Sequence, residues 1–416
     1  MIFTNLINEF KKNNLLFNFL LSLFLLYPIS IVFGPALIEI TILFSSIIFI
    51  YYLVIKEYSL SSNFKERNFI VIFLFITICI ASSLASENIF YSLKSSFFTL
   101  RFLLYFLIVF FLLKYSENII LLFFYITSAF ILICLVDSYM QLILGFNIFF
   151  YETGQNRVTG LFFEEKKLGR YLITISPILV GIYLLKVKKE INKKLIIVFT
   201  FLIFIFFICL FTAERVSMFY SGFTIFILII CAYKISKKYL LLFLIPIILL
   251  TSIYQLKIYK FDDQVKNTIK QITNNKSEFS YPSKEHRAFM ITSYKLFKEN
   301  LLLGVGPKNY RNKCGEVEFK GIKNCSTHPH NIFFQLLGET GILGTLIYIY
   351  IFFLIFKKIL FFIFFEKILD PKIFFILPVF YFLNPFLPSG NFFNNWYMAI
   401  GTVSLPFYMY FNENKK

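Results

Sequence analysis

Two of the three histidines of this chain stand together in the stretch THPHNIFFQLLGETGILG. His328 and His330 come just before an apolar segment that carries Gln335 and Glu339. An imidazole changes charge near neutral pH and is the side chain most often used in general acid–base catalysis. Asn331, Gln335 and Glu339 are four residues apart, so they would form one polar stripe on a helix. The stretch therefore predicts a reactive histidine at the start of a helix with polar groups behind it.

Arginines are the second kind of side chain here that could do chemistry. Arg215 lies in TAERVSMFYSG, Arg287 in HRAFMITSYKLF, and Arg157 in NRVTGLFFEEKKLGRYL. A guanidinium stays charged and can hold phosphate oxygens through two parallel hydrogen bonds. These arginines predict a site for a diphosphate. For Arg215 the alternative is an interfacial side chain that only reaches the lipid headgroups.

The start of the histidine-bearing helix supports the same chemistry. Pro329 suits the beginning of a helix, and Thr327 or His328 could cap it. The amides at that helix end would favour a phosphate. Glu339 lies about 13.5 Å further along the helix than His330 at 1.5 Å per residue. We therefore expect Glu339 to be a structural residue of a polar network rather than a partner in proton transfer.

Composition defines the elements that must position these residues. Of the 416 residues, 58% are hydrophobic and 15% charged, and the mean hydropathy is +0.74. These values are typical of an all-α polytopic membrane protein, in which each crossing helix needs about 20 apolar residues. We expect about twelve transmembrane helices, at roughly 14–33, 36–55, 69–85, 97–113, 119–144, 171–187, 195–212, 216–233, 239–256, 332–356, 372–388 and 393–411.

Lysine and arginine predict the orientation. With a cytoplasmic N-terminus, twenty Lys or Arg fall in the connections and tails on the cytoplasmic side of the membrane. Six fall in the short connections on the outer side, as the positive-inside rule requires. The chain then divides into residues 1–256 with nine helices, a long outer loop at 257–330, and residues 331–416 with three helices. That loop holds all three histidines and fourteen Lys or Arg against seven Asp or Glu. It predicts an anionic partner, and the net charge of +18 does not require nucleic acid.

The outer loop also carries local signals. Residues 285–299 repeat apolar side chains at three- and four-residue steps, which predicts an amphipathic helix lying against the membrane, and Gly304 and Gly306 then predict a turn. Cys314 and Cys325 are eleven residues apart, where an oxidising compartment would permit a disulfide.

Within the predicted spans, Arg101 and Asp137 are ionisable groups at membrane depth. They could serve a site or form a structural pair with each other. Asp262 and Asp263 are adjacent in the outer loop, and we expect them to be surface charges rather than a metal site. We expect neither a metal nor another cofactor.

A resemblance makes the reading more specific. HNIFFQLLGETGILG after a loop with GVGPKNY, and TAERVSMFYSG upstream, resembles the O-antigen ligase and polymerase family of bacterial envelope glycosyltransferases. The resembling region spans roughly 196–350. NRVTGLFFEEKKLGRYL is similar to a block often found just before it, and PSGNFFNNW to one seen in some members.

The resemblance implies a GT-C-like membrane glycosyltransferase in the bacterial inner membrane, with its site facing the periplasm. The donor would be a glycan linked to undecaprenyl diphosphate, and membrane lipids would surround the protein. By motif position, His330 matches the catalytic histidine, and Arg215 and Arg287 match the arginines that bind the diphosphate. We add Arg157, His328 and Asn331 as expected substrate contacts. Glu214 departs from the small residue that the family commonly has before the first arginine, which puts the role of that arginine in question.

Three activities remain open from the sequence. A ligase would join O-antigen to lipid A core, and this is the favoured reading. A polymerase would use the same donor but a growing glycan as acceptor. A transporter of an anionic polysaccharide precursor is the alternative from another class. Transporters usually show two related halves and broken helices near mid-membrane, whereas the polar residues here gather at one surface.

Overall fold

The computed structural model describes residues 11, 13–55, 67–152, 157–255, 283–317, 325–366 and 369–413. Over these residues the chain is helical, without strands and with one isolated bridge between Phe146 and Glu152. The longer helices are α2 (Leu15–Phe33), α3 (Pro35–Ile55), α5 (Ile89–Tyr115), α6 (Glu117–Leu144), α7 (Leu168–Lys186), α8 (Ile191–Phe211), α9 (Arg215–Tyr233) and α14 (Ile332–Phe364). The shorter ones are α4 (Arg67–Leu84), η2 (Gly160–Phe162), η3 (Lys237–Phe243), α10 (Leu244–Gln255), α12 (Lys284–Glu299), α13 (Tyr310–Lys313), η4 (Cys314–Glu316), α15 (Ile373–Leu383), α16 (Asn395–Thr402) and α17 (Leu405–Glu413).

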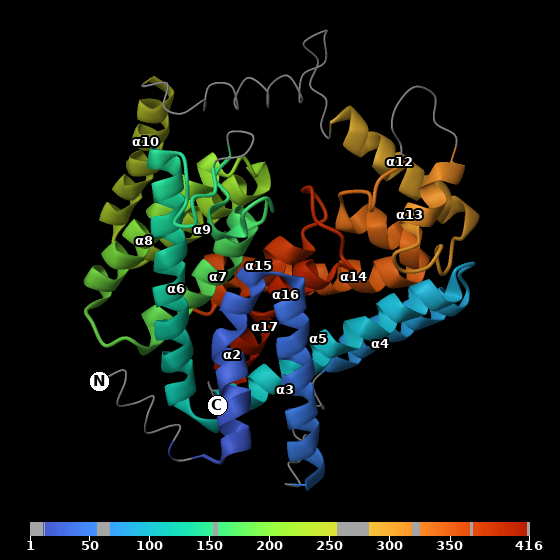
Figure 1. Cartoon of the computed structure of the whole chain (residues 1–416). Helices are drawn as coiled ribbons and strands as arrows, with labels where there is room; N and C mark the ends of the chain where they lie inside the picture. The colour runs from blue at the N-terminus through green and yellow to red at the C-terminus, as the bar shows by residue number, and fades with distance from the viewer. Residues whose placement is uncertain are drawn as a thin grey trace.

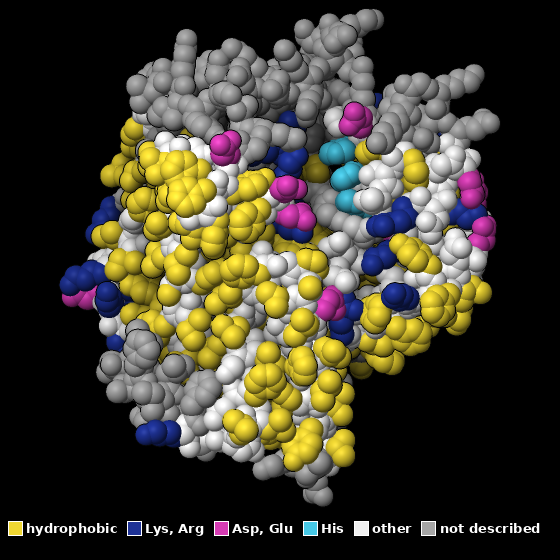
Figure 2. All heavy atoms as spheres, in the orientation of Figure 1, with side chains coloured by type: hydrophobic (Ala, Val, Ile, Leu, Met, Phe, Trp, Pro, Cys, Tyr) yellow, Lys and Arg dark blue, Asp and Glu magenta, His cyan; other side chains and the backbone are white. Residues whose placement is uncertain are grey.

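Eight helices of the described chain are long and apolar enough to cross a membrane: α2, α3, α5, α6, α7, α8, α9 and α14. Shorter apolar helices occur at Ile70–Leu84 and Ile373–Leu383. Apolar side chains cover much of the visible surface (Figure 2), as contact with lipid requires. The structure is that of a multi-pass helical membrane protein, which confirms the predicted all-α polytopic class.

Two of the predicted spans have a different form from the one expected. The segment 239–256 is divided between η3 and the twelve-residue α10, and 393–411 is divided between α16 and α17. Proline accounts for both interruptions, because it lacks an N–H and is favoured in the first turn of a helix. Pro246 lies in the first turn of α10, and Pro406 in the first turn of α17. The number of twelve membrane crossings therefore stays a prediction.

The helices fall into two groups around α2 and α3 (Figure 1). Helices α6, α8, α9 and α10 lie on one side, and the α4–α5 pair lies on the other, below α12 and α13. Helix α12 packs on α14, and α14 packs on α4. One large apolar core runs through the bundle. A separate small core forms beneath α12 and α13, from Leu296, Val305, Tyr310, Cys314 and Val317.

Helix α14 is broken at Gly341, whose φ of 63° lies outside the helical region. The loop at residues 301–306 fills the break: Val305 N–H donates to Gly338 O and Gly306 N–H to Glu339 O, both at 2.9 Å. A Cβ on Gly304 would lie 2.6 Å from the backbone of α14, so only glycine permits this approach. The loop supplies partners for backbone groups that the break removes from the helix. The predicted turn at Gly304 and Gly306 is thus confirmed.

Charged residues at membrane depth are paired differently from the prediction. Arg101 Nη2 lies 2.7 Å from Glu39 Oε1, and its guanidinium also lies over the ring of Phe102. Asp137 Oδ1 accepts a hydrogen bond from Ile148 N–H at 2.9 Å. The suggested Arg101–Asp137 pair is therefore wrong, because each side chain finds its partner on another segment.

Candidate functional site

All three histidines meet at one place in the fold. The ring of His330 lies 4.1 Å from that of His328 and 5.0 Å from that of His286, between ring centroids. Phe289 contributes a fourth ring at 5.7 Å from His330. Figure 2 shows the histidine side chains in a column along one wall of a hollow, with Lys and Arg side chains on both sides. Helix α12 and the loop before α14 position this cluster.

His330 has an unusual backbone conformation. Its φ of 56° places a non-glycine residue in the left-handed region, which is sparsely populated and persists only where the surroundings hold it. The carbonyl of His330 accepts a hydrogen bond from Ser389 N–H at 2.9 Å. On the ring, Nε2 lies 3.3 Å from Ser326 Oγ. This conformation turns the half-buried imidazole toward the other two histidines.

The cap of α14 differs from the prediction. Asn331, rather than Thr327 or His328, is the N-cap, and its Oδ1 accepts from Phe334 N–H at 3.1 Å. Its Nδ2 donates to Pro385 O at 2.7 Å. Because Asn331 is buried and both ends of its amide are occupied, the geometry favours a positioning role over the predicted substrate contact.

His328 is also held within the protein. Its Nε2 lies 3.2 Å from Ser389 O and its Nδ1 lies 3.0 Å from Thr327 Oγ1. A carbonyl can only accept, so Nε2 carries the proton and Nδ1 accepts from the hydroxyl. Burial and then the charge of His330 lower the pKa of His328 to about 3. His328 is thus a neutral imidazole with both nitrogens occupied, which favours orientation of His330 over direct contact with substrate.

His330 is neutral as well. Burial and then the charge of His286 lower the pKa of His330 to about 4. Burial and the positive charge of Arg215 lower the pKa of His286, although Glu285 opposes this effect. A neutral imidazole is the form that can accept a proton. At neutral pH, His330 is therefore in the state that a general base requires.

Two of the three predicted arginines join the histidines. Arg215 is the first residue of α9 and follows Ala213, which has a φ of 54°. The positive charge of Arg215 acts on His286, and that of Arg157 acts on Arg215. Two arginines distant in sequence from the histidines are thus coupled electrostatically, Arg157 to Arg215 and Arg215 to His286. Arg287, in the first turn of α12, is exposed and forms no ion pair within the described chain, so its contact with a diphosphate stays a prediction.

The carboxylate of Glu214 is held by hydrogen bonds to residues of α7 and α9. One carboxylate oxygen accepts from Gly169 N–H at 3.0 Å, and the other accepts from Ser217 Oγ at 2.8 Å. The charge of Arg170 also acts on Glu214, and the Arg170 guanidinium lies over the ring of Tyr397. Glu214, which replaces the small residue expected before Arg215, therefore links the start of α7 to α9.

Behind the histidines lies a buried polar network on α14. Gln335 Nε2 donates to Glu339 Oε2 and to Asn391 Oδ1, each at 2.9 Å. Glu339 Oε1 accepts from Tyr310 N–H at 3.1 Å, and Gln335 Oε1 accepts from Phe392 N–H at 2.9 Å. The network joins α13, α14 and the segment before α16. The structural role expected of Glu339 stays a prediction.

Cys314 and Cys325 form a disulfide, with their Cα atoms 5.0 Å apart. The predicted pairing is therefore present in the structure. Cys314 belongs to the small core beneath α12 and α13, and Cys325 packs against it. Because Cys325 comes shortly before His330 in the chain, the disulfide ties the histidine-bearing loop to the α12–α13 segment (residues 283–317).

Removing this disulfide is expected to loosen the α12–α13 segment. Replacing Cys314 and Cys325 together by serine should lower the free energy of unfolding by about 2–4 kcal/mol, since the cross-link restricts the unfolded chain. Limited proteolysis of the purified protein, with and without reductant, measures the effect. Reductant should speed cleavage of the wild type and leave the variant unchanged. Free thiols at both positions in non-reducing mass spectrometry would contradict the pairing.

Sequence reasoning missed two members of the site. His286 lies 5.0 Å from His330, and its only sequence signal was that histidine is rare in this chain. The backbone of Ser389 is hydrogen-bonded to both His328 and His330. Ser389 belongs to the PSGNFFNNW block that carried part of the resemblance. Among the described residues, no group of three or more His, Cys, Asp or Glu side chains is arranged to hold a metal ion.

Together the fold and the site define a class: helical multi-pass membrane proteins with a cationic, histidine-lined hollow suited to anionic groups. Residues 173–349 match a family model described as O-Antigen ligase. Over this region the chain is similar to the O-antigen ligase family. The match begins earlier than the expected 196–350, in α7, and includes Arg215, Arg287, His330 and Glu339. No curated protein matches the sequence.

Proposed function

We propose that this protein is a membrane glycosyltransferase of the bacterial inner membrane, with its site on the periplasmic face. It would move a glycan from undecaprenyl diphosphate to an acceptor hydroxyl, and ligation of O-antigen to lipid A core is the favoured form. The observation that carries the proposal is the cluster of three histidines, in which the ring of His330 lies 4.1 Å from that of His328 and 5.0 Å from that of His286, with the charge of Arg215 acting on His286. A GT-C-like arrangement with about twelve crossings is part of this proposal.

The proposed reaction uses each group for one task. The acceptor oxygen attacks the sugar carbon attached to the diphosphate, and the bond from that carbon to the phosphate oxygen breaks. His330 accepts the proton of the acceptor hydroxyl. Arg157 and Arg215 stabilise the negative charge of the departing undecaprenyl diphosphate, and Arg287 is proposed to assist them. The hydrogen bonds of His328 and Asn331 hold the His330 loop in place.

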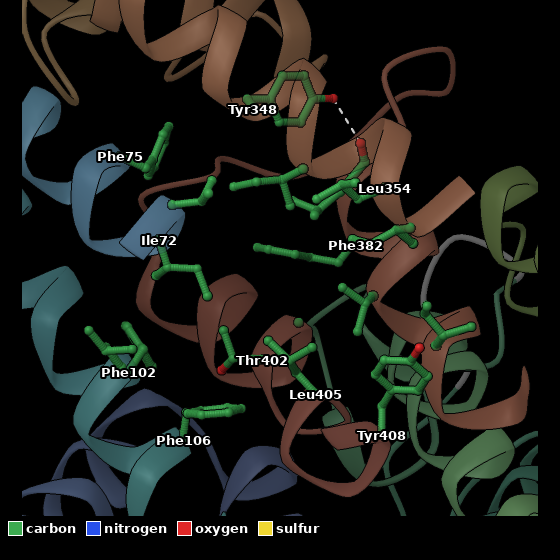
Figure 3. A pocket seen from close by; sticks show the side chains of 18 of the residues that line it. Ile72, Phe75, Phe102, Phe106, Tyr348, Leu354, Phe382, Thr402, Leu405 and Tyr408 are labelled. Atoms are coloured by element: carbon green, nitrogen blue, oxygen red, sulfur yellow. Dashed lines mark hydrogen bonds between the residues drawn. The ribbon is translucent and has the colours of Figure 1, made fainter. Parts of the chain in front are cut away.

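An apolar cavity offers a place for part of the lipid chain. It has a volume of about 540 Å³ and lies among α4, α5, α14, α15, α16 and α17. Side chains such as Phe75, Phe106 and Leu354 surround it (Figure 3). Phe392 also lines the cavity, and its N–H donates to Gln335 of the network behind the histidines. We propose that the isoprenoid chain of the donor occupies this cavity.

The decisive experiment is reconstitution of the purified protein with a defined glycan on undecaprenyl diphosphate. One sample receives lipid A core as acceptor, and a second contains only the lipid-linked glycan. Glycan on lipid A core would show a ligase, and longer lipid-linked glycans would show a polymerase. Movement of intact donor across the bilayer without a new glycosidic bond would show a transporter and reject the proposal.

The depressed pKa of His330 predicts the pH dependence. A base that is active when neutral loses activity as pH falls through its pKa, which is about 4 for His330. We therefore expect kcat/KM, which reports the free enzyme, to stay level from about pH 8 down to about pH 5 and to decline below that. Initial rates of transfer in detergent, with the protein's integrity checked at each pH, measure this. A decline centred near 6.5, the ordinary value for histidine, would contradict a buried His330 as the base.

A further inference from the structure

The segment that joins α15 to α16 is hydrogen-bonded to the loop that carries the histidines. We call residues 385–391 of this segment the clamp. Ser389 N–H donates to His330 O at 2.9 Å, and His328 Nε2 donates to Ser389 O at 3.2 Å. The φ of 56° at His330 is a sparsely populated conformation that persists only where the surroundings hold it. Hydrogen bonds to the clamp on both sides of Pro329 therefore stabilise this conformation.

Each end of the clamp adds one further hydrogen bond to the same loop. At one end, Asn331 Nδ2 donates to Pro385 O at 2.7 Å. At the other end, Asn391 Nδ2 donates to Thr327 O at 3.4 Å. Thr327 comes directly before His328, so this bond acts on the start of the histidine loop. From Thr327 to Asn331, every residue except the proline is thus hydrogen-bonded to the clamp.

Asn391 also joins the clamp to the helix that follows the histidines. Its Oδ1 accepts from Gln335 Nε2 on α14 and from Phe393 N–H, each at 2.9 Å. Gln335 Oε1 in turn accepts from Phe392 N–H at 2.9 Å. Asn391 and Gln335 are both buried, and a buried amide that loses its partners is costly. The side chain of Asn391 therefore connects the clamp both to the histidine loop and to α14.

We propose that Asn391 is a positioning residue, which orients the imidazole of His330 for proton transfer by holding the clamp between α14 and the histidine loop. This rests on the proposed function, in which His330 is the general base. Asn391 acts through other residues, since its side chain bonds to Thr327 O and to Gln335 rather than to His330. A base must lie within hydrogen-bond reach of the proton that it accepts, and a displacement of about 1 Å can lower a rate about 10²-fold.

The test is Asn391→Leu, which keeps a side chain of similar size and removes the hydrogen bonds to Thr327 and Gln335. We expect kcat to fall roughly 10- to 100-fold, with KM for the donor unchanged, because the arginines proposed to bind the donor are untouched. A second variant, Asn391→Asp, keeps an oxygen that accepts from Gln335 and Phe393 and loses only the donor to Thr327 O. It should show a smaller loss in the same parameter, and it decides the question alone if Asn391→Leu does not fold.

A double-mutant cycle separates positioning from a general loosening of the fold. If Asn391 acts through His330, Asn391→Leu should lower kcat in the wild type and have little further effect in His330→Asn. A merely structural loss would lower the residual rate of His330→Asn by the same factor. Asn394→Ala is the matched control, because this exposed asparagine lies in the same segment but caps α16, accepting from Tyr397 N–H at 3.2 Å. It should retain the wild-type kcat.

Hydrogen–deuterium exchange gives a readout that does not depend on transfer. In the solubilised full-length protein, the bond to His330 O protects the amide of Ser389, which should exchange faster in Asn391→Leu than in wild type or Asn394→Ala. If wild type transfers nothing, the proposed function fails, while faster exchange at Ser389 still supports positioning of the loop by Asn391. Unchanged exchange, an unchanged kcat in the folded variant, or equal losses with and without His330 would overturn the proposal.

Discussion

The variant His330→Asn is expected to lose glycan transfer, with kcat/KM lower by about 10²- to 10⁴-fold, the usual contribution of a positioned general base. Asparagine is the sharpest replacement, because it tolerates the left-handed backbone that His330 adopts at φ 56° better than alanine does. Its amide cannot accept a proton at neutral pH. The loss should fall mainly on kcat, since donor binding depends on the arginines. Initial rates with the reconstituted donor and lipid A core measure both parameters.

A parallel His330→Gly variant removes the ring while relieving the backbone strain. It should be as inactive as His330→Asn and at least as resistant to heat, which separates loss of chemistry from loss of fold. Thermal unfolding and size-exclusion chromatography of both variants provide this comparison. Full transfer activity in either well-folded variant would exclude His330 as the base.

The second large effect is expected at Arg215. Arg215→Ala should lower kcat/KM by about 10²- to 10³-fold, the range seen when one group that stabilises developing charge is removed. Arg215→Lys should recover only part of the loss, because an ammonium keeps the charge but not the two parallel hydrogen bonds. Dissociation constants for undecaprenyl diphosphate, measured on the solubilised variants, test the same contact without chemistry.

Lys298→Ala serves as the control for charge, because this exposed lysine lies over the ring of Tyr294 at the far end of α12 from His286. A wild-type affinity and rate in Arg215→Ala would mean that this arginine only anchors the end of α9, as in the interfacial alternative. If Arg215→Ala binds the donor weakly but transfers glycan at the wild-type rate at saturating donor, Arg215 stabilises the bound donor and not the transition state.

Several features could be predicted from sequence because their signals are local. The amphipathic pattern of residues 285–299 matches α12, the turn at Gly304 and Gly306 is present, and Cys314 pairs with Cys325. The similarity to the O-antigen ligase family model over residues 173–349 also followed from short motifs around His330. In each case the determining residues lie close together in the chain.

Features that depend on distant segments could not be predicted. Arg101 pairs with Glu39, which is 62 residues away, and no periodicity identifies such a partner. His286 joins His330 only because α12 packs on α14. Asn331 displaces the expected caps because the extended backbone before α14 directs its side chain to Phe334 N–H and Pro385 O. Apolar composition likewise overestimated helix continuity at Pro246 and Pro406.

The break at Gly341 has a consequence for how the protein is assembled. Backbone groups without partners are costly in a bilayer, so α14 on its own would favour an unbroken helix across residues 338–342. It can bend only once residues 301–306 arrive to bond with Gly338 and Glu339. Those residues are synthesised before α14, so their docking sets when the break can form. We expect a chain in which residues 301–306 cannot dock to keep α14 straight and to leave the histidines unassembled.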